Sequence, residues 1–250
     1  MSRSDLLPLE GDSIPYDRQT LVVDVSFDFI CPWSMVGKRS LRLAIQRLEK
    51  IRPDVSVEVR WHGRPVLPNT PPGGLPYHTL YLTRTGSRTA AAARRMQVEK
   101  AGEALGVFFD FSRIRILPNT DAAHRLVEHV ARHGTRMCAE LLIDRIFKAY
   151  FIDAENIGCT TVLRRLAADF GVGAAVAESL LDMAAVHPGH SKSPRGRPRK
   201  PGGIAAVSEV PFFLFNRTTA LSGAHSYDAM LSAMLAAVPS GCRESAAKAA

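Results

Sequence analysis

Residues 21–48 read LVVDVSFDFICPWSMVGKRSLRLAIQRL, and this stretch decides the fold. Its first part, residues 21–29, is rich in valine and phenylalanine and alternates like a buried strand. Pro32 suits the first turn of a helix, and Pro53 ends that helix. Between them, apolar residues recur at helical spacing: Leu41, Ala44, Ile45 and Leu48. VSVEVRWHG, residues 55–63, follows as a second strand, so the opening predicts a βαβ unit with parallel strands.

After a loop rich in proline and glycine, GRPVLPNTPPGGLP, the sequence pattern changes from strands to helices. From about Tyr77 to Ala185 almost every pattern is helical, including residues 87–105, 120–134 and 136–150. Two strands, VPFFLFN and TALSGA, and a last helix, SYDAMLSAMLAAV, complete the chain. The order predicts an α/β fold in which a helical subdomain, residues 65–186, interrupts the strands.

Composition is ordinary for a globular protein, with 250 residues, 46% hydrophobic and 22% charged. No apolar run approaches the roughly 20 residues that cross a bilayer. The first twenty residues contain acids and two prolines, which is unlike a signal peptide. We therefore expect a cytoplasmic protein without a membrane partner, with a disordered arm over residues 1–19 and a frayed tail over residues 239–250.

The cysteines do not form a C-x-x-C pair, which argues against a disulfide framework and a zinc site: Cys31, Cys138, Cys159 and Cys242. Cys138 and Cys159 lie in helical patterns and are interpreted as packed small hydrophobes. Cys31 stands where a strand passes into a helix. Free N–H groups and positive partial charge there predict a lowered thiol pKa and a reactive thiolate. The alternative is a half-buried cysteine beside a helix cap.

Several other side chains are candidates for lining a ligand cleft between the subdomains. Asn119 and His124 lie in LPNTDAAHRL. We favour a capping or turn role for Asn119, whereas for His124 a place in the cleft and packing in the core both remain open. His129 and His133 have the i, i+4 spacing of metal ligands but lack a third ligand in register, so we interpret them as a solvated face and predict no metal.

Much of the net charge of +8 comes from one segment, SKSPRGRPRKPGG, which holds five cations and no acid. Its centre resembles an AT-hook, in which Arg195, Arg197 and Arg199 would enter the narrow minor groove of A·T-rich DNA. A flexible solvated loop over residues 187–203 is the alternative, and we favour it over nucleic-acid binding through residues 195–200.

Motifs spread over residues 20–238 together resemble the DsbA-like branch of the thioredoxin superfamily, in particular FrnE-like proteins. Related members are 2-hydroxychromene-2-carboxylate isomerases and kappa-class glutathione transferases. The segments that carry the likeness are FDFICPWSMVGKRSL, LPNTDAAHRL, AYF, EVPFFLFN and LSGAHSYDAML. The resemblance implies a thioredoxin domain, residues 20–64 and 204–238, with the helical subdomain inserted between its second and third strands. It also implies that Pro32 and Trp33 line the site and that a cis Val210–Pro211 loop faces Cys31, presenting the Val210 backbone to a peptide or glutathione.

Two departures from that family affect the expected chemistry. Ser34 stands where a second cysteine would resolve a mixed disulfide. His225 replaces a usual glutamine and Glu209 a usual small residue, near the expected cleft. Three mechanisms remain open: monothiol disulfide exchange at Cys31 completed by an external thiol such as glutathione, a glutathione-dependent isomerase or transferase reaction on an aromatic electrophile, and binding without catalysis. We adopt the first as the working hypothesis, with glutathione as co-substrate rather than bound cofactor, and a homodimer is compatible with it.

Overall fold

The computed structural model describes residues 18–186 and 209–238. The N-terminal arm, the basic loop and the C-terminal tail lie outside the described residues, and so do Arg195, Arg197 and Arg199. The predictions made for them therefore stay predictions. Among the residues that are described, no helix combines the length and the apolar character that a membrane span requires.

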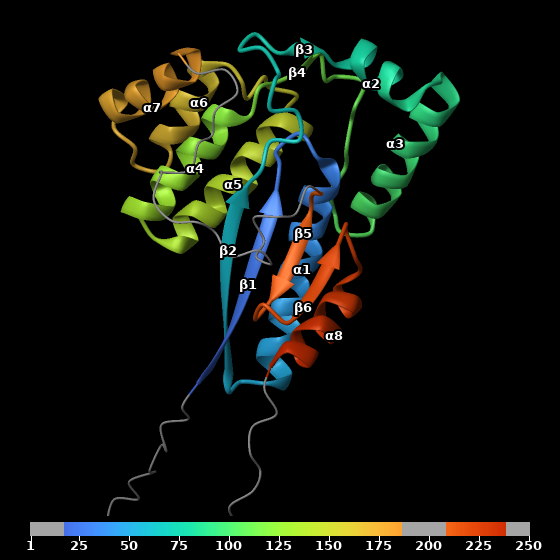
Figure 1. Ribbon diagram of the computed structural model, residues 1–250, viewed down its shortest axis with the longest axis vertical. Coiled ribbons are helices and arrows are strands. Elements are labelled where there is room, and N and C mark those ends of the chain that lie inside the picture. Colours follow the sequence, from blue (N-terminus) through green and yellow to red (C-terminus); the bar gives the residue numbers. More distant parts are fainter. Residues whose placement is uncertain (1–17, 187–208, 239–250) are drawn as a thin grey trace, which may run out of the picture.

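The main sheet has the strand order β2-β1-β5-β6 (Figure 1). Strands β1 (Gln19–Phe27) and β2 (Val55–Gly63) run parallel, as the βαβ prediction requires. Strands β5 (Phe212–Phe215) and β6 (Thr219–Ser222) are antiparallel to their neighbours. Strand β1 thus lies between one strand that precedes the helical insertion and one that follows it, which brings the two ends of the insertion together.

Helices α1 (Pro32–Ile51) and α8 (Tyr227–Ala237) pack against each other and the sheet. The apolar spacing of α1 explains this, because the residues that recur at helical intervals are the ones that become buried. Together these elements form the core of the thioredoxin part: Leu21, Val23, Val25, Leu41, Ala44, Leu48, Phe213, Phe215, Met230 and Met234.

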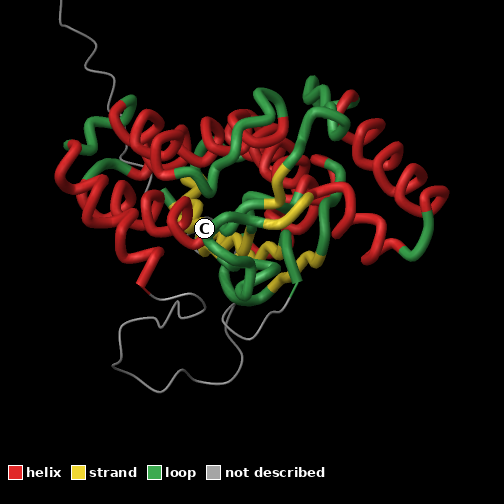
Figure 2. The backbone as a smooth tube through the Cα atoms, turned by 90° about the horizontal axis from the view of Figure 1, so that it is seen from above, coloured by secondary structure: helices red, strands yellow, loops and turns green. Residues whose placement is uncertain are grey.

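The predicted helical insertion is present between β2 and β5. It consists of α2 (Tyr77–Thr85), α3 (Arg88–Glu103), α4 (Asp121–His133), α5 (Arg136–Phe151), α6 (Thr160–Ala168) and α7 (Ala174–Val186). Helices α2 and α3 lie on one side of the molecule and α4, α6 and α7 on the other (Figures 1 and 2). A short ribbon, β3 (Leu75–Pro76) with β4 (Ile116–Leu117), is not predicted by the sequence, because two-residue strands carry no periodicity.

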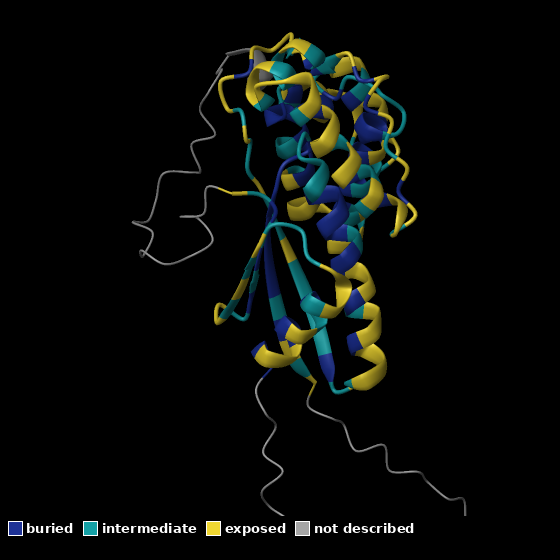
Figure 3. Ribbon diagram, turned by 90° about the vertical axis from the view of Figure 1, so that its right-hand side faces the viewer, coloured by how far each residue is buried: buried dark blue, intermediate teal, exposed yellow. Residues whose placement is uncertain are grey.

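The insertion has its own core, and the first part of the chain contributes to it. Phe27 and Phe29, at and just after the end of β1, and Met35, near the start of α1, are buried among the aromatic and aliphatic residues of α4 and α5. Phe29, for example, packs edge-on against Phe147 with ring centroids 5.1 Å apart. Buried residues line the inner sides of the elements while their outer sides are exposed (Figure 3). The end of β1 and the start of α1 are therefore held between two cores.

A buried lysine connects α1 with α5. The Lys38 side chain is 2% exposed, and its Nζ lies 2.9 Å from Asp144 and 3.4 Å from Glu140. The ammonium group also lies 5.3 Å from the ring centroid of Trp61. The two carboxylates are only partly buried, at 25% and 31% exposure, so they are less desolvated than the lysine. The two carboxylates neutralise the buried ammonium group of Lys38, and the ion pairs hold α1 against the insertion.

Replacing Lys38 with alanine should lower the free energy of unfolding by about 2 kcal/mol. This is less than the loss for a fully buried pair, because water reaches both carboxylates, and it includes the lost packing of the lysine stem. Urea denaturation measures it. The control is Lys50→Ala, an exposed lysine in the last turn of the same helix, which should change stability by less than about 0.5 kcal/mol. Equal effects of the two substitutions would contradict the account.

Candidate active site

Cys31 is the N-cap residue of α1, with extended backbone angles of φ −93° and ψ 106°. Its amide donates to the Asp28 carbonyl at 3.1 Å, and its carbonyl accepts from the Ser34 amide at 2.9 Å. The chain therefore turns directly from the strand end into the helix, with Pro32 at a position where no N–H is needed. The thiol is held at the helix start, as predicted.

The loop before β5 faces this thiol. The Val210–Pro211 bond is cis, which confirms the expectation from the family resemblance. Cys31 Sγ donates to the Val210 carbonyl oxygen at 3.5 Å, although the two residues are 179 positions apart in the chain. The loop is held on its other side by the Gly223 amide, which donates to the Pro211 carbonyl at 2.8 Å. The structure thus brings together Cys31, Val210 and Pro211.

The predicted direction of the Cys31 pKa is wrong: its pKa is raised above the ordinary thiol value. Burial of the thiol is the largest cause, and the negative charge of Asp28 adds to it. Hydrogen bonds from the Ser34 hydroxyl and from the Ser34 and Trp33 amides lower the pKa, but they do not offset burial. The amides at the start of the helix lower the Cys31 pKa, as expected, but burial and the charge of Asp28 raise it by more.

Ser34 is enclosed, with 2% exposure, at the position of the missing second cysteine. Its Oγ accepts a long hydrogen bond of 3.4 Å from the Asp28 amide, and its hydroxyl also interacts with the Cys31 thiol. A hydroxyl cannot form a disulfide, so Ser34 acts on Cys31 only through hydrogen bonding. Cys31 is thus the one thiol at this junction among the described residues.

Asp28 is a functional residue that the sequence reasoning missed. Its side chain is fully buried; Oδ2 accepts from the Val66 amide at 2.7 Å, and Oδ1 lies 3.0 Å from His124 Nε2. The available signal was an acid between two phenylalanines, three residues before the cysteine, in a run that is otherwise largely apolar. A buried acid of this kind implies specific partners, which the structure supplies.

His124 reaches this junction from α4. Its ring stacks on Phe29 at a centroid distance of 4.8 Å, and its Nδ1 is buried without a hydrogen-bond partner among the described residues. We therefore assign its proton to Nε2, which faces the Asp28 carboxylate. The ring passes close to Gly63, where a Cβ would lie 2.3 Å from Nδ1, so glycine at the end of β2 leaves the space that His124 occupies.

Asn119 has both ends of its amide engaged within the protein: it accepts from the Asp121 amide at 2.9 Å and donates to the Thr70 carbonyl at 2.6 Å. This matches the favoured capping role, and its part in substrate binding stays a prediction. Trp33 is half-buried against the core of the insertion. His129 and His133 stack on each other at 4.3 Å, and no cluster of three or more metal-ligating residues occurs in the described parts of the chain.

His225 and Glu209 lie beside the proline loop and share one neighbour. Ser222 Oγ donates to Glu209 at 2.7 Å, and the Ser222 carbonyl lies 2.9 Å from His225 Nε2. Both side chains are thus anchored at the end of β6, next to the segment that faces Cys31. Their predicted influence on substrate preference stays a prediction.

Cys159 is not the packed hydrophobe that its sequence pattern predicts, because it is the half-buried N-cap of α6. Hydrogen bonds from the amides of Val162 and Thr161 lower the pKa of its thiol. At pH 7 a larger fraction of Cys159 than of Cys31 is therefore thiolate, because the pKa of Cys31 is shifted upward. Experiments on Cys31 must for this reason remove Cys159.

Replacing Asp28 with asparagine should lower the Cys31 pKa, because it removes the nearby negative charge. The pH dependence of iodoacetamide alkylation measures this, in a protein in which Cys138, Cys159 and Cys242 are replaced by serine. The alkylation midpoint should move to lower pH. The control is Asp24→Asn, a buried acid of β1 that pairs with His62 at 2.7 Å; it should leave the midpoint unchanged. A midpoint unmoved by Asp28→Asn would contradict the role assigned to this charge.

Known proteins with similar sequences and structures agree with this architecture. A family model described as the DSBA-like thioredoxin domain matches residues 22–235. The uncharacterized protein YwbO of Bacillus subtilis (strain 168) is 26% identical over 167 residues, which cover 65% of this chain and 72% of that protein.

Two solved structures share the fold. A probable DsbA oxidoreductase from Streptomyces coelicolor superposes with a TM-score of 0.69 at 22% identity, covering 87% of this chain and 89% of the other. A 2-hydroxychromene-2-carboxylate isomerase superposes with a TM-score of 0.55 at 13% identity, covering 86% and 93%. With most of its length matched by the family model, the chain belongs to the DsbA-like thioredoxin-domain family, as its motifs predicted.

Proposed function

We propose that the protein is a monothiol disulfide oxidoreductase in which Cys31 is the nucleophile. The observation that carries the proposal is the contact of the Cys31 thiol with the Val210 carbonyl, at 3.5 Å, beside a buried serine in place of a second cysteine. The family resemblance implies that a substrate disulfide would meet the enzyme at this junction. The substrate backbone would pair with Val210 as an added strand.

The first step consumes a disulfide. The Cys31 thiolate attacks one sulfur of a substrate R–S–S–R′, forms a Cys31–S–S–R mixed disulfide and releases R′–S⁻, which takes up a proton. No external oxidant is required, because the substrate disulfide is reduced as the enzyme sulfur is oxidised. A substrate that takes over the Val210 carbonyl would also remove the hydrogen bond that favours the protonated thiol.

The second step needs another thiol. Ser34 cannot attack the mixed disulfide, so a thiolate such as glutathione attacks the substrate sulfur, forms R–S–S–G and returns Cys31 as a thiolate. The enclosure of Ser34 also bears on the isomerase or transferase alternative. A hydroxyl 2% exposed and already engaged with the Asp28 amide and the Cys31 thiol is poorly placed to hold the sulfur of a bound glutathione.

The raised pKa of Cys31 gives the proposal a pH dependence. Below that pKa only a fraction of Cys31 is thiolate, so exchange accelerates as the pH rises and levels off above the range of an ordinary thiol. We expect the rate of glutathionylation by oxidised glutathione, measured by intact mass in the protein that retains only Cys31, to rise throughout pH 7 to 9. A rate that reaches its plateau near neutral pH would contradict the assignment.

The monothiol character is tested by Ser34→Cys. In the protein that retains only Cys31, oxidised glutathione should produce a lasting adduct about 305 Da heavier, the mass of one glutathione less two hydrogens, one from each thiol. With Ser34→Cys, the introduced thiol attacks the adduct and releases glutathione. The product should then be an internal disulfide between Cys31 and the introduced thiol, about 2 Da lighter than the reduced protein.

The matched control is Ser34→Ala, which should keep the adduct. Because it removes a hydrogen bond that lowers the Cys31 pKa, adduct formation should be slower at pH 7. Absence of an adduct on Cys31 both in the protein that keeps Ser34 and in Ser34→Ala, together with absence of the internal disulfide in Ser34→Cys, would exclude disulfide exchange and favour the binding alternative, provided that circular dichroism shows an intact fold.

A further inference from the structure

A groove of about 570 Å³ lies beside α1, between α5 and the segment that follows α3. Its walls are largely apolar and include Met35, Val107, Phe108, Leu141, Ile152 and Phe170. Neither Cys31, Ser34 nor Pro211 lines it, so it is distinct from the thiol site. Its volume falls within the range of roughly 300–1,000 Å³ that is typical of small-molecule sites.

Two large apolar side chains of the groove are unusually open to solvent. Phe108 is 71% exposed and Leu141 is 50% exposed, although both come from segments whose neighbours are buried in the core of the insertion. Exposed apolar side chains gathered at a concave surface indicate an interaction site, whereas scattered ones do not. A ligand with an apolar body would cover both.

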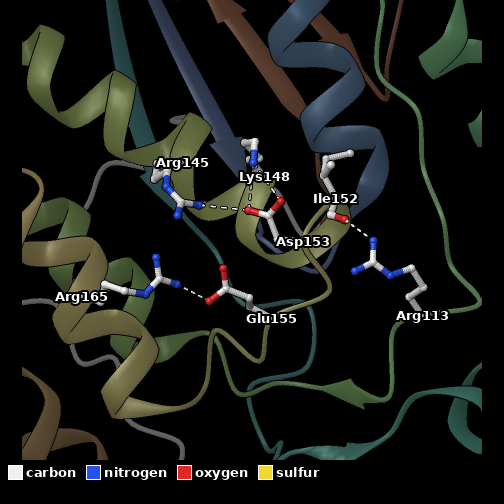
Figure 4. A network of polar contacts seen from close by, with 7 residues as sticks. All are labelled: Arg113, Arg145, Lys148, Ile152, Asp153, Glu155 and Arg165. Carbon is white, nitrogen blue, oxygen red and sulfur yellow. Dashed lines mark hydrogen bonds and ion pairs between the residues drawn. The ribbon is translucent and has the colours of Figure 1, made fainter.

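Most charged groups at the rim are already neutralised. Figure 4 shows Arg145 and Lys148 directed at the Asp153 carboxylate, at 3.3 Å and 2.8 Å. The acid of the groove, Asp144, is held by Lys38 at 2.9 Å. These groups give the rim polarity without leaving a carboxylate free to repel an anion.

Arg39 is different, because it lines the groove and has no ion pair within residues 18–186 and 209–238. Its Nε is buried and lacks a hydrogen-bond partner there, which leaves a donor unsatisfied. Arg113, which does not itself line the groove, donates to the backbone carbonyl of Ile152 at 3.2 Å (Figure 4). The side chains that line the groove carry more positive than negative charge, with Arg39, Arg145 and Lys148 against Asp144.

We propose that this groove binds a small amphipathic monoanion, a molecule with an apolar body and one carboxylate. The carboxylate pairs with the terminal nitrogens of the Arg39 guanidinium, whose planar fork matches carboxylate geometry. The apolar body covers Phe108 and Leu141. A single negative charge suffices, because the other rim cations are paired or exposed. Binding in the groove does not depend on exchange chemistry at Cys31, and the two can fail separately.

Isothermal titration calorimetry with octanoate and with 1-octanol tests the proposal, since the pair differs chiefly in charge. Octanoate should bind with 1:1 stoichiometry and more tightly than 1-octanol. Arg39→Gln should weaken octanoate about tenfold and leave 1-octanol unchanged, as expected for loss of one charged hydrogen-bonded pair. The control Arg42→Gln, which removes an exposed cation of the same helix outside the groove, should change neither.

A second variant keeps the test decisive if Arg39→Gln folds poorly. Leu141 is half exposed, so Leu141→Glu should fold, and it should weaken both ligands, octanoate more because of the added negative charge. Equal affinity for the two ligands, no binding at millimolar concentration, or insensitivity of octanoate to both variants would overturn the proposal. So would sedimentation velocity showing a dimer that Phe108→Ser dissociates, because the groove would then be a contact between copies of the chain.

Discussion

The contact on which the site depends is that of the buried Asp28 carboxylate with its two donors. A charge without solvent exposure is tolerated only when hydrogen bonds replace water. Here one donor comes from the loop after β2, through Val66, and the other from α4, through His124. The end of β1, that loop and the helical insertion therefore meet at a single negative group. Cys31 lies three residues further along the chain, within reach of its field.

Helix α1 connects the thiol site with the rest of the molecule. Its apolar face belongs to the core of the thioredoxin part, its start presents the thiol, and Lys38 ties it to α5. Met35 and Arg39 reach the groove from the same helix. A shift of α1 would thus alter the thiol, the ion cluster and the groove together, so these three features are expected to respond jointly to substitutions in the helix.

The sequence predicts those features of the fold that rest on local periodicity and on motifs. The βαβ opening, the helical insertion, the cis bond before Pro211 and the position of Cys31 at the start of a helix are all confirmed. The predicted direction of the Cys31 pKa is wrong, because it depends on burial by segments as distant as Val210, 179 residues away. The partnership of Asp28 with His124 joins positions 96 apart, which no local pattern reveals. The roles of Asn119, His225 and the basic loop stay predictions.

Ser34 shows how small a change separates a serine from a cysteine at this position. Serine and cysteine differ by one atom, and the enclosure at the start of α1 accepts the hydroxyl beside the thiol. A single exchange at this position could separate a self-sufficient dithiol enzyme from one that relies on the thiols around it, without repacking the fold. The difference between the two chemistries would then lie in one side-chain atom, and not in the packing of the fold.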